Sequence, residues 1–182
     1  PTVEGIVLTA GQNPAQDPDR SPPIRFERPT PADGAAIWEL VATTTLDLNS
    51  PYAYVLWGDH FAATSCLARD DRGLVGFVMG HRVPARPDTL FVWQVGVTER
   101  ARGTGLASRL LDEVWSGQPD VRHLEATVTP SNTASDRLFR SFGARHDAPV
   151  HVEPAYDEAH FPGQGHEAEI LYRIGPVRRG AP

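Results

Sequence analysis

The sequence predicts a mixed α/β fold, in which helices cover the faces of a central β-sheet. Several short segments alternate apolar and polar residues as half-buried strands do, and longer ones place apolar residues at helical spacing. The order along the chain is strand, two helices, three strands, helix, strand, helix and a final strand. A chain of 182 residues can bury one sizeable core, so a single domain is expected.

This domain is expected to span residues 23–176. Residues 1–22 are rich in Pro, Gly, Asp and Gln and show no sustained period, which predicts a disordered N-terminal arm. Residues 177–182 are expected to form a short C-terminal tail.

The first predicted elements are a strand and two helices. Residues 24–28 alternate like a strand. Thr30, Pro31 and Asp33 form a helix-start signal, with a capping hydroxyl, a proline at the first helical position and an acid. A second short helix is expected within residues 51–61.

The middle of the chain is predicted to form three strands. Residues 65–69 and 74–83 are strand-like runs joined by Asp-Asp-Arg-Gly, which predicts a hairpin. A loop at residues 84–88 precedes a strand at residues 89–98, which runs into the glycine-rich turn of residues 100–105.

The last predicted elements alternate between helix and strand. A helix with an apolar stripe follows the glycine turn, and Gly117 ends it. A strand at residues 124–129 and a helix over residues 133–143 come next. Residues 168–174 alternate again and close the sheet, whereas the Pro- and Gly-rich stretch before them is expected to be a loop.

Composition excludes several functional classes. The net charge of −6 argues against a nucleic-acid partner. The chain contains no lysine, which rules out a Schiff-base lysine and a P-loop lysine. The single Cys66 cannot form an internal disulfide, which suits a reducing cytoplasm. No apolar run approaches the roughly 20 residues needed to cross a membrane, and no signal peptide opens the chain, so a cytoplasmic protein without a membrane partner is expected.

The turn at residues 100–105 predicts a phosphate-binding site. A strand that leads through glycines into a helix aims backbone amides and a helix N-terminus at one spot, and two arginines add positive charge. A Rossmann turn would need a third glycine, and a Walker loop would need a lysine. Both are absent here.

The pattern Arg-x-x-Gly-x-Gly after a strand resembles the pyrophosphate-binding motif of the GCN5-related N-acetyltransferase (GNAT) superfamily. The stretches over residues 128–135 and 138–143 resemble the Val-x-x-x-Asn-x-x-Ala and Leu-Tyr-x-x-x-Gly-Phe motifs of the same superfamily. The resemblance implies a GNAT fold with a mixed, mostly antiparallel sheet flanked by helices, and acetyl-CoA as co-substrate without a metal.

Two further motifs are more specific. Asp-x-Asn-Ser-x-Tyr at residues 47–52 and Phe-Val-Trp-Gln-Val at residues 91–95 resemble the L-2,4-diaminobutyrate acetyltransferase family of ectoine biosynthesis. That resemblance implies transfer of an acetyl group to the γ-amine of a small diamino acid, a role in osmoadaptation, and a homodimer. Alternatives are an acetyltransferase for another small amine, a polyamine or a protein N-terminus, and an acyl-CoA-binding regulatory domain without catalysis.

The superfamily resemblance implies a set of cofactor-binding residues. Val95 and Val97 would offer main-chain groups to the pantetheine and thioester, and a bulge is expected at Gly96. Asn132 and Ser135 would flank the pantetheine on the other side. The residues implied around the pyrophosphate are Arg102, Gly103, Thr104, Gly105, Leu106 and Ala107.

Three residues are candidates for proton transfer. The superfamily often uses a tyrosine where this chain has Phe139, so Tyr52 is a candidate acid for the departing thiolate; it could equally be a packing residue. Glu125 could relay a proton or lie on a solvated strand face. His166 could reach the mouth of the pocket or simply be exposed.

Four residues are candidates for binding the substrate. Asp47 could pair with an ammonium group or cap a helix, and Trp93 could form a wall or cation–π surface or belong to the core. Asn49 and Glu167 follow from the family pattern. Strand alternation places Phe91, Trp93, Val95 and Val97 on one face, and an arginine is expected to bind the substrate carboxylate.

Two features could suggest other chemistry. The late cluster of His151, Glu153, Glu158, His160, His166 and Glu167 matches no zinc spacing, so no metal is expected. Cys66 lies in a predicted strand, where a lone cysteine is usually a small hydrophobe. Direct transfer in a ternary complex is therefore expected.

Overall fold

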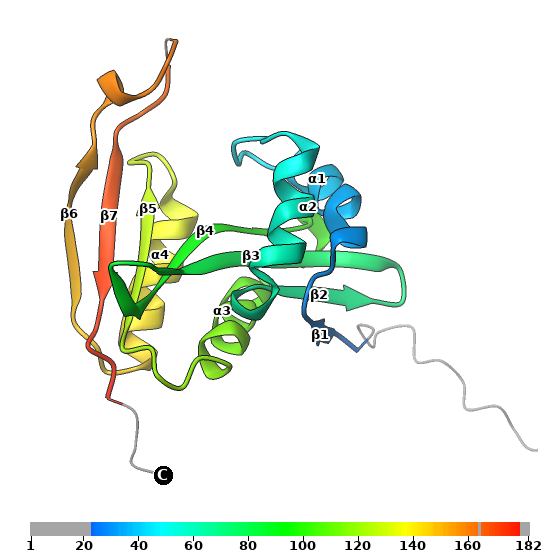
Figure 1. The fold of residues 1–182 in the computed structure, drawn as a ribbon, viewed down its shortest axis with the longest axis horizontal. Coiled ribbons are helices and arrows are strands. Elements are labelled where there is room, and N and C mark those ends of the chain that lie inside the picture. The colour runs from blue at the N-terminus through cyan, green and yellow to red at the C-terminus, as the bar shows by residue number, and fades with distance from the viewer. Residues whose placement is uncertain (1–22, 164, 179–182) are drawn as a thin grey trace, which may run out of the picture.

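A computed structural model describes residues 23–163 and 165–178. The predicted arm and most of the predicted tail lie outside the described residues. A seven-stranded sheet with the order β1-β2-β3-β4-β5-β7-β6 forms the centre of the domain (Figure 1). Every neighbouring pair is antiparallel except β4 and β5. The strands are β1 Arg25–Glu27, β2 Cys66–Asp70, β3 Gly73–Val83, β4 Arg86–Val97, β5 His123–Val128, β6 Val150–Tyr156 and β7 Glu169–Ile174.

Helices cover both faces of this sheet, which confirms the predicted class (Figure 1). On one face, α1 and α2 enclose a buried cluster of Ile37, Leu40, Val41, Tyr54, Leu67, Phe77 and Met79, called here the α1–α2 cluster. On the other, α3 and α4 enclose a larger α3–α4 cluster that includes Leu110, Leu124 and Phe142. The helices are α1 Gly34–Val41, α2 Pro51–His60, α3 Leu106–Ser116 and α4 Thr133–Arg145, with short 3₁₀ turns η1 Pro31–Asp33, η2 Ala62–Thr64, η3 Glu99–Ala101 and η4 Glu158–His160.

The predicted helix start at Thr30 is present, but as a 3₁₀ turn. The Thr30 amide and hydroxyl both donate to Asp33 Oδ2, at 2.7 and 2.8 Å. These bonds fix the first turn, and α1 continues from Gly34. Local capping chemistry therefore sets where the chain enters the α1–α2 layer.

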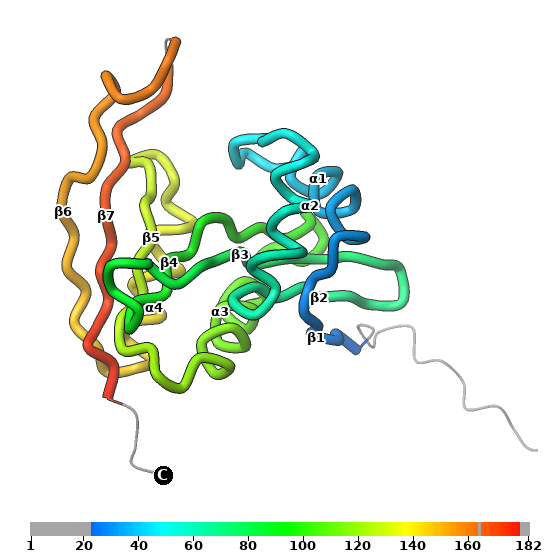
Figure 2. Tube along the Cα trace, in the orientation of Figure 1, coloured from blue at the N-terminus to red at the C-terminus, as the bar shows by residue number. Residues whose placement is uncertain are grey.

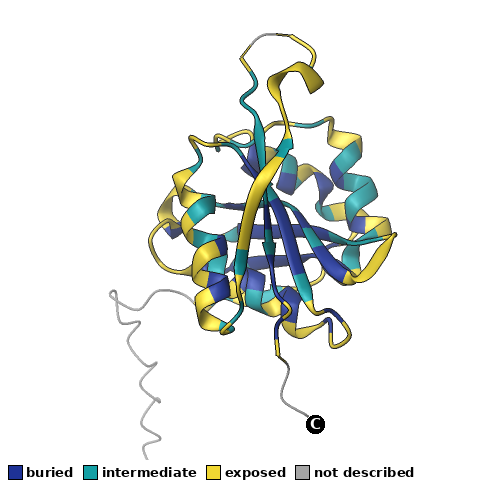
Figure 3. Cartoon of the chain, turned by 90° about the vertical axis from the view of Figure 1, so that its left-hand side faces the viewer, coloured by how far each residue is buried: buried dark blue, intermediate teal, exposed yellow. Residues whose placement is uncertain are grey.

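Two predicted loops are wrong. The loop at 84–88 is only a turn at Pro84 and Ala85, because β4 begins at Arg86. The stretch before the last strand contains β6, which pairs with β7 from Val150 to Tyr156 with an irregularity at Ala155. It lies at the sheet edge and is mostly exposed (Figure 3), so the burial of its residues does not alternate, and its Pro154 is tolerated there. The β6–β7 hairpin extends beyond the rest of the sheet (Figure 2).

The packed domain extends past its predicted end. Val177 is 2% exposed, belongs to the α3–α4 cluster, and donates its amide to the Arg122 carbonyl at 2.8 Å. This residue is therefore part of the core and not of the C-terminal tail that the sequence predicts.

Strands β4 and β5 separate near the middle of the sheet. They pair only from Thr89 to Val92 of β4, although both strands continue. In the β3–β4 ladder, Met79 faces Gln94 while Gly80 faces Val92, so Trp93 is the extra residue of a β-bulge. A Cβ on Gly80 would lie 2.7 Å from the Phe91 carbonyl oxygen, and only glycine allows this close approach.

The bulge corrects two predictions. It lies at Trp93, whereas Gly96, where it was expected, pairs regularly with Phe77. Because one extra residue shifts the alternation, Trp93 packs against the α1–α2 cluster while Val95 and Val97 pack against the α3–α4 cluster. The prediction that these side chains share one face is therefore wrong.

Candidate active site

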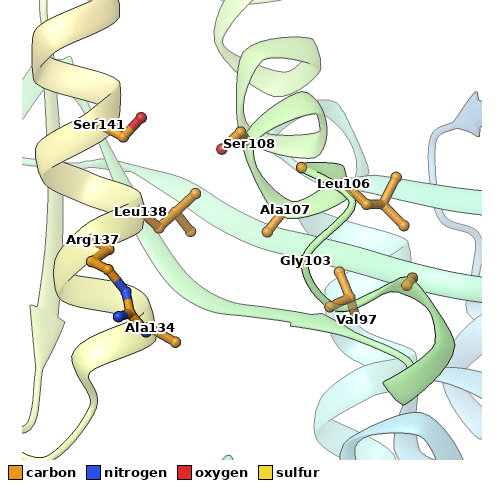
Figure 4. A pocket seen from close by; sticks show the side chains of 11 residues that line it. Val97, Gly103, Leu106, Ala107, Ser108, Ala134, Arg137, Leu138 and Ser141 are labelled. Atoms are coloured by element: carbon orange, nitrogen blue, oxygen red, sulfur yellow. The ribbon is translucent and has the colours of Figure 1, made fainter.

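A cleft of about 310 Å³ lies between the start of α3 and the side of α4, here called the glycine-turn cleft (Figure 4). Gly103 and Gly105 adopt left-handed φ angles of +75° and +78°, which favour glycine. A Cβ at either position would meet nothing within 4 Å, so the turn is open toward a ligand. Its lining residues are Val97, Ala101, Gly103, Gly105, Leu106, Ala107, Ser108, Ala134, Arg137, Leu138 and Ser141.

This cleft fits a phosphate group. The first amides of α3 have no intrahelical acceptor, and the helix dipole places partial positive charge at the same end. Open glycines beside a helix N-terminus are the usual cradle for a pyrophosphate. The residues present therefore suit the phosphorylated portion of a coenzyme.

The structure brings half of the predicted cofactor residues to this cleft. Those that line it are Val97, Gly103, Gly105, Leu106 and Ala107. Thr104 donates its hydroxyl to the Ala101 carbonyl at 2.8 Å, Val95 packs against the core, and Arg102 is not among the lining residues. Asn132 caps α4 by accepting the Ser135 amide at 3.0 Å.

Arg100, the first residue of the glycine-turn motif, forms an ion pair inside the protein and is not among the residues that line the cleft. Its guanidinium forms an ion pair with both oxygens of Asp70, whose side chain is fully buried at the end of β2. Arg100 holds the pKa of Asp70 below its usual range, and a hydrogen bond from the Arg72 amide adds to this effect. This arginine therefore ties the turn to the β2–β3 hairpin.

A second cavity of about 390 Å³ lies where β4 and β5 separate, here called the acidic cavity. It collects the predicted residues Asp47, Asn49, Trp93, His166 and Glu167, together with Asn132. The full lining comprises Thr45, Leu46, Asp47, Asn49, Trp93, Gln94, Thr127, Val128, Thr129, Ser131, Asn132, Gly165, His166, Glu167 and Glu169.

The charge of this cavity suits a small cation. Three carboxylates line it, and burial raises the pKa of Glu169, while a hydrogen bond with Thr127 acts in the opposite direction. The pKa of His166 is raised, first by its hydrogen bond to the Glu167 carbonyl (2.7 Å), with a further contribution from Asp47 at 3.5 Å. The expected arginine is absent from the described lining residues.

Sequence reasoning missed Glu169 and Gln94. Glu169 opens β7 two residues after Glu167, so its position on the final strand was the available signal. Gln94 belongs to a quoted motif, but its role depends on the bulge, which turns its side chain toward the α1–α2 layer.

A buried hydrogen-bond network, here called the Tyr54 network, holds one wall of the acidic cavity. Tyr54 is fully buried; its hydroxyl donates to Gln94 Oε1 at 3.3 Å and accepts the Asn49 amide at 3.2 Å. Gln94 Nε2 donates to the Asp47 carbonyl at 2.8 Å, and Trp38 Nε1 donates to the Asn49 carbonyl at 3.2 Å. Helices α1 and α2 and strand β4 thus fix the segment that carries Asp47 and Asn49.

Trp93 also lines the acidic cavity and stacks on Trp57. The two ring centroids are 4.1 Å apart and the planes differ by 18°. Trp93 thus offers an aromatic surface in the cavity that three carboxylates also line, and its role as a wall for the substrate stays a prediction.

Two predicted proton-transfer residues lie outside both cavities. Tyr52 is on the first turn of α2 and is 67% exposed. Glu125 is 2% exposed and forms ion pairs with Arg173 and, at 2.7 Å, with Arg86. Phe139 is buried and packs against Tyr172, with the ring centroids 6.2 Å apart.

The part of the chain that the structure describes was predicted to lack a metal site, a reactive cysteine and a membrane-spanning segment, and three observations bear on these features. Across residues 23–163 and 165–178, no group of three or more His, Cys, Asp or Glu is placed to hold a metal ion. Cys66 is buried, and burial raises the pKa of its thiol to about 11. In the same described ranges, no helix is both long and apolar enough to span a bilayer.

Comparison with known proteins gives one consistent family. The model of the Acetyltransferase (GNAT) family matches residues 34–144. An L-2,4-diaminobutyric acid acetyltransferase from Halalkalibacterium halodurans is 46% identical over 156 residues, or 85% of this chain and 82% of the relative. One from Streptomyces coelicolor is 47% identical over 162 residues, or 86% of this chain and 95% of the relative.

Solved structures agree with this result. Diaminobutyrate acetyltransferase EctA from Paenibacillus lautus, in complex with its substrate L-2,4-diaminobutyric acid and coenzyme A, superposes with a TM-score of 0.84 at 40% identity. The match covers 89% of this chain and 100% of that one. The ribosomal-protein-S18-alanine N-acetyltransferase of Escherichia coli shares the fold, with a TM-score of 0.64 at 16% identity over 86% of this chain and 96% of that one.

Proposed function

Because the chain belongs to the L-2,4-diaminobutyric acid acetyltransferases of the GNAT family, we propose that it transfers the acetyl group of acetyl-CoA to the γ-amine of L-2,4-diaminobutyrate. This reaction serves ectoine biosynthesis. The glycine-turn cleft holds the phosphates of acetyl-CoA, and the acidic cavity holds the diamino acid.

The observation that carries this proposal is the position of two complementary sites along β4. Val97 lines the glycine-turn cleft, whereas Trp93 and Gln94 line the acidic cavity. Between these residues, β4 is free of β5 and its main chain can bind an extended acyl arm. A thioester that enters from the cleft can therefore meet an amine held in the cavity.

The acidic cavity matches the charge of the substrate. Diaminobutyrate carries two ammonium groups and one carboxylate, and the cavity offers Asp47, Glu167 and Glu169. An aliphatic amine has a pKa of roughly 10.4, so it must lose a proton before it attacks. Among these carboxylates, Glu169 is the best suited acceptor, because burial raises its pKa toward the working range of a base.

The remaining candidate roles are also proposals. His166 lines the cavity beside Asp47 and can carry the proton onward, while Tyr52 stays our candidate acid for the departing thiolate. Glu125 acts indirectly, since its ion pairs hold Arg86 and Arg173 where β4, β5 and β7 meet. Arg102 stays our candidate for binding the pyrophosphate, whereas Thr104 supports the glycine turn and Ser135 supports the start of α4 through their hydrogen bonds.

We further propose a cytoplasmic homodimer that takes part in osmoadaptation. The lone free Cys66 suits a reducing compartment. Edge strand β6 exposes the apolar side chains of Val152 and Tyr156, which supports pairing with a second copy. Light scattering coupled to size-exclusion chromatography tests the stoichiometry.

A thiol-release assay tests the proposed reaction. The purified chain with acetyl-CoA should release free coenzyme A with diaminobutyrate, and far more slowly with polyamines or a peptide N-terminus. Preference for a polyamine would overturn the substrate assignment. Tight binding of coenzyme A without turnover on any amine would favour the regulatory alternative.

A further inference from the structure

We infer that Arg137 on α4 binds a phosphate group of coenzyme A and thereby selects the full cofactor over shorter thioesters. This inference rests on the proposed function and adds a charged side chain to a cleft whose other described lining residues offer backbone amides and the hydroxyls of Ser108 and Ser141. Arg137 lies outside the glycine-turn motif, on the opposite wall of the cleft (Figure 4).

The three arginines of α4 differ in their partners. Arg140 pairs with Asp136 at 2.7 Å, and Arg145 pairs with Asp112 at 2.8 Å. Arg137 lines the cleft, and within the described ranges it has no hydrogen bond or ion pair. The neighbouring Asp136 forms its hydrogen bonds with Arg140 and with the Tyr172 hydroxyl at 2.6 Å, and Arg137 acts on it only through its charge, which adds to the lowering of the Asp136 pKa.

Arg137 is the only charged residue among those described as lining the cleft. Coenzyme A brings a pyrophosphate and a phosphate monoester to a chain whose net charge is −6. Backbone amides of the glycine turn and α3 supply partial charges from one wall. A guanidinium on the facing wall supplies a full charge and can bind phosphate oxygens through two parallel hydrogen bonds.

Two other nearby arginines are less suited to this role. Arg109, on α3, lies over the Phe26 ring with its guanidinium carbon 4.9 Å from the centroid. Arg100 is held by Asp70. The hydroxyls of Ser108 and Ser141 line the same cleft and can add hydrogen bonds beside Arg137.

The test uses Arg137→Gln and three acetyl donors: acetyl-CoA, acetyl-dephospho-CoA and S-acetylpantetheine. We expect Arg137→Gln to lower kcat/KM with acetyl-CoA about tenfold, the loss typical of one charge-assisted contact to an exposed phosphate. With S-acetylpantetheine, which carries no phosphate, the variant and the wild type should be equal. Calorimetry with coenzyme A should show the same tenfold weakening of Kd, independently of turnover.

Acetyl-dephospho-CoA identifies which phosphate Arg137 binds. A loss that disappears with this donor assigns the 3′-phosphate, and a loss that persists assigns the pyrophosphate; both support the inference. Arg137→Lys should recover part of the affinity, and Arg140→Gln, one turn away on the same helix, should leave Kd unchanged. Equal losses of Arg137→Gln with all three donors, or an unchanged Kd, would overturn the inference. Wild-type turnover of diaminobutyrate is measured first, so that failure of the proposed function is seen separately.

Discussion

Replacement of Tyr54 by phenylalanine tests whether the Tyr54 network shapes the substrate site. The change removes one oxygen atom from a fully buried residue and keeps its ring. The Asn49 amide then loses its acceptor, and Gln94 Oε1 loses its donor. The bond from Gln94 to the Asp47 carbonyl stays, so the wall should loosen without collapsing.

The cost can be worked out from the two lost bonds. An intramolecular hydrogen bond contributes about 1 kcal/mol net, and a buried partner left unsatisfied costs about 1–3 kcal/mol. Because both bonds are long, at 3.2 and 3.3 Å, we expect a loss of about 2 kcal/mol in the free energy of unfolding. For a domain of this size, that loss lowers Tm by roughly 4–8 °C.

Kinetics separate a positioning role from a purely structural one. The KM for diaminobutyrate should rise severalfold, because Asp47 and Asn49 are held less firmly, while the KM for acetyl-CoA stays unchanged. Urea unfolding, hydrogen exchange at the Asn49 amide and steady-state kinetics are the measurements. Tyr156→Phe removes the same atom from a residue that is 52% exposed and keeps the ring proposed to face a second copy, so it should change neither stability nor KM. Equal rises in both KM values, or no loss of stability, would refute the reasoning.

Three other predictions follow from the same geometry. Arg100→Ala should lower the free energy of unfolding by about 2–3 kcal/mol at neutral pH, because Asp70 stays buried without its partner, and the loss is limited because Arg100 is itself 40% exposed. Since the folded pKa of Asp70 is depressed, the difference in stability between the wild type and the variant should shrink as the pH falls below about 4. Urea unfolding at several pH values measures this difference. Glu169→Gln should remove the acidic limb of the pH profile of kcat/KM for diaminobutyrate. In the wild type, protonation of this carboxyl, whose pKa is raised, lowers kcat/KM as the pH is lowered. An unchanged limb would exclude Glu169 as the base. Tyr52→Phe should lower kcat far more than the affinity for acetyl-CoA, and equal losses would indicate a structural role.

Strongly periodic segments and motifs could be predicted from the sequence, whereas irregular features could not. The helix after the glycine turn has a clear apolar stripe, and both its position and the open turn before it were predicted. Strand β6 lies at an exposed edge, so no burial pattern marks it. The bulge at Trp93 depends on the close approach of Gly80 to β4, which is a property of the ladder and not of either segment alone.

This bulge explains why the two most specific motifs of the chain, at residues 47–52 and 91–95, lie side by side in the structure. Asp47 and Trp93 lie far apart in sequence, yet the Asp47 carbonyl accepts a hydrogen bond from Gln94, the residue that follows Trp93. An ordinary strand would alternate Trp93 and Gln94 to opposite faces. The extra residue places both on the α1–α2 side, so Trp93 stacks on Trp57 while Gln94 reaches the Asp47 carbonyl. The same irregularity lies where β4 leaves β5, so one bulge opens the sheet for the acyl arm and fixes the wall that faces it.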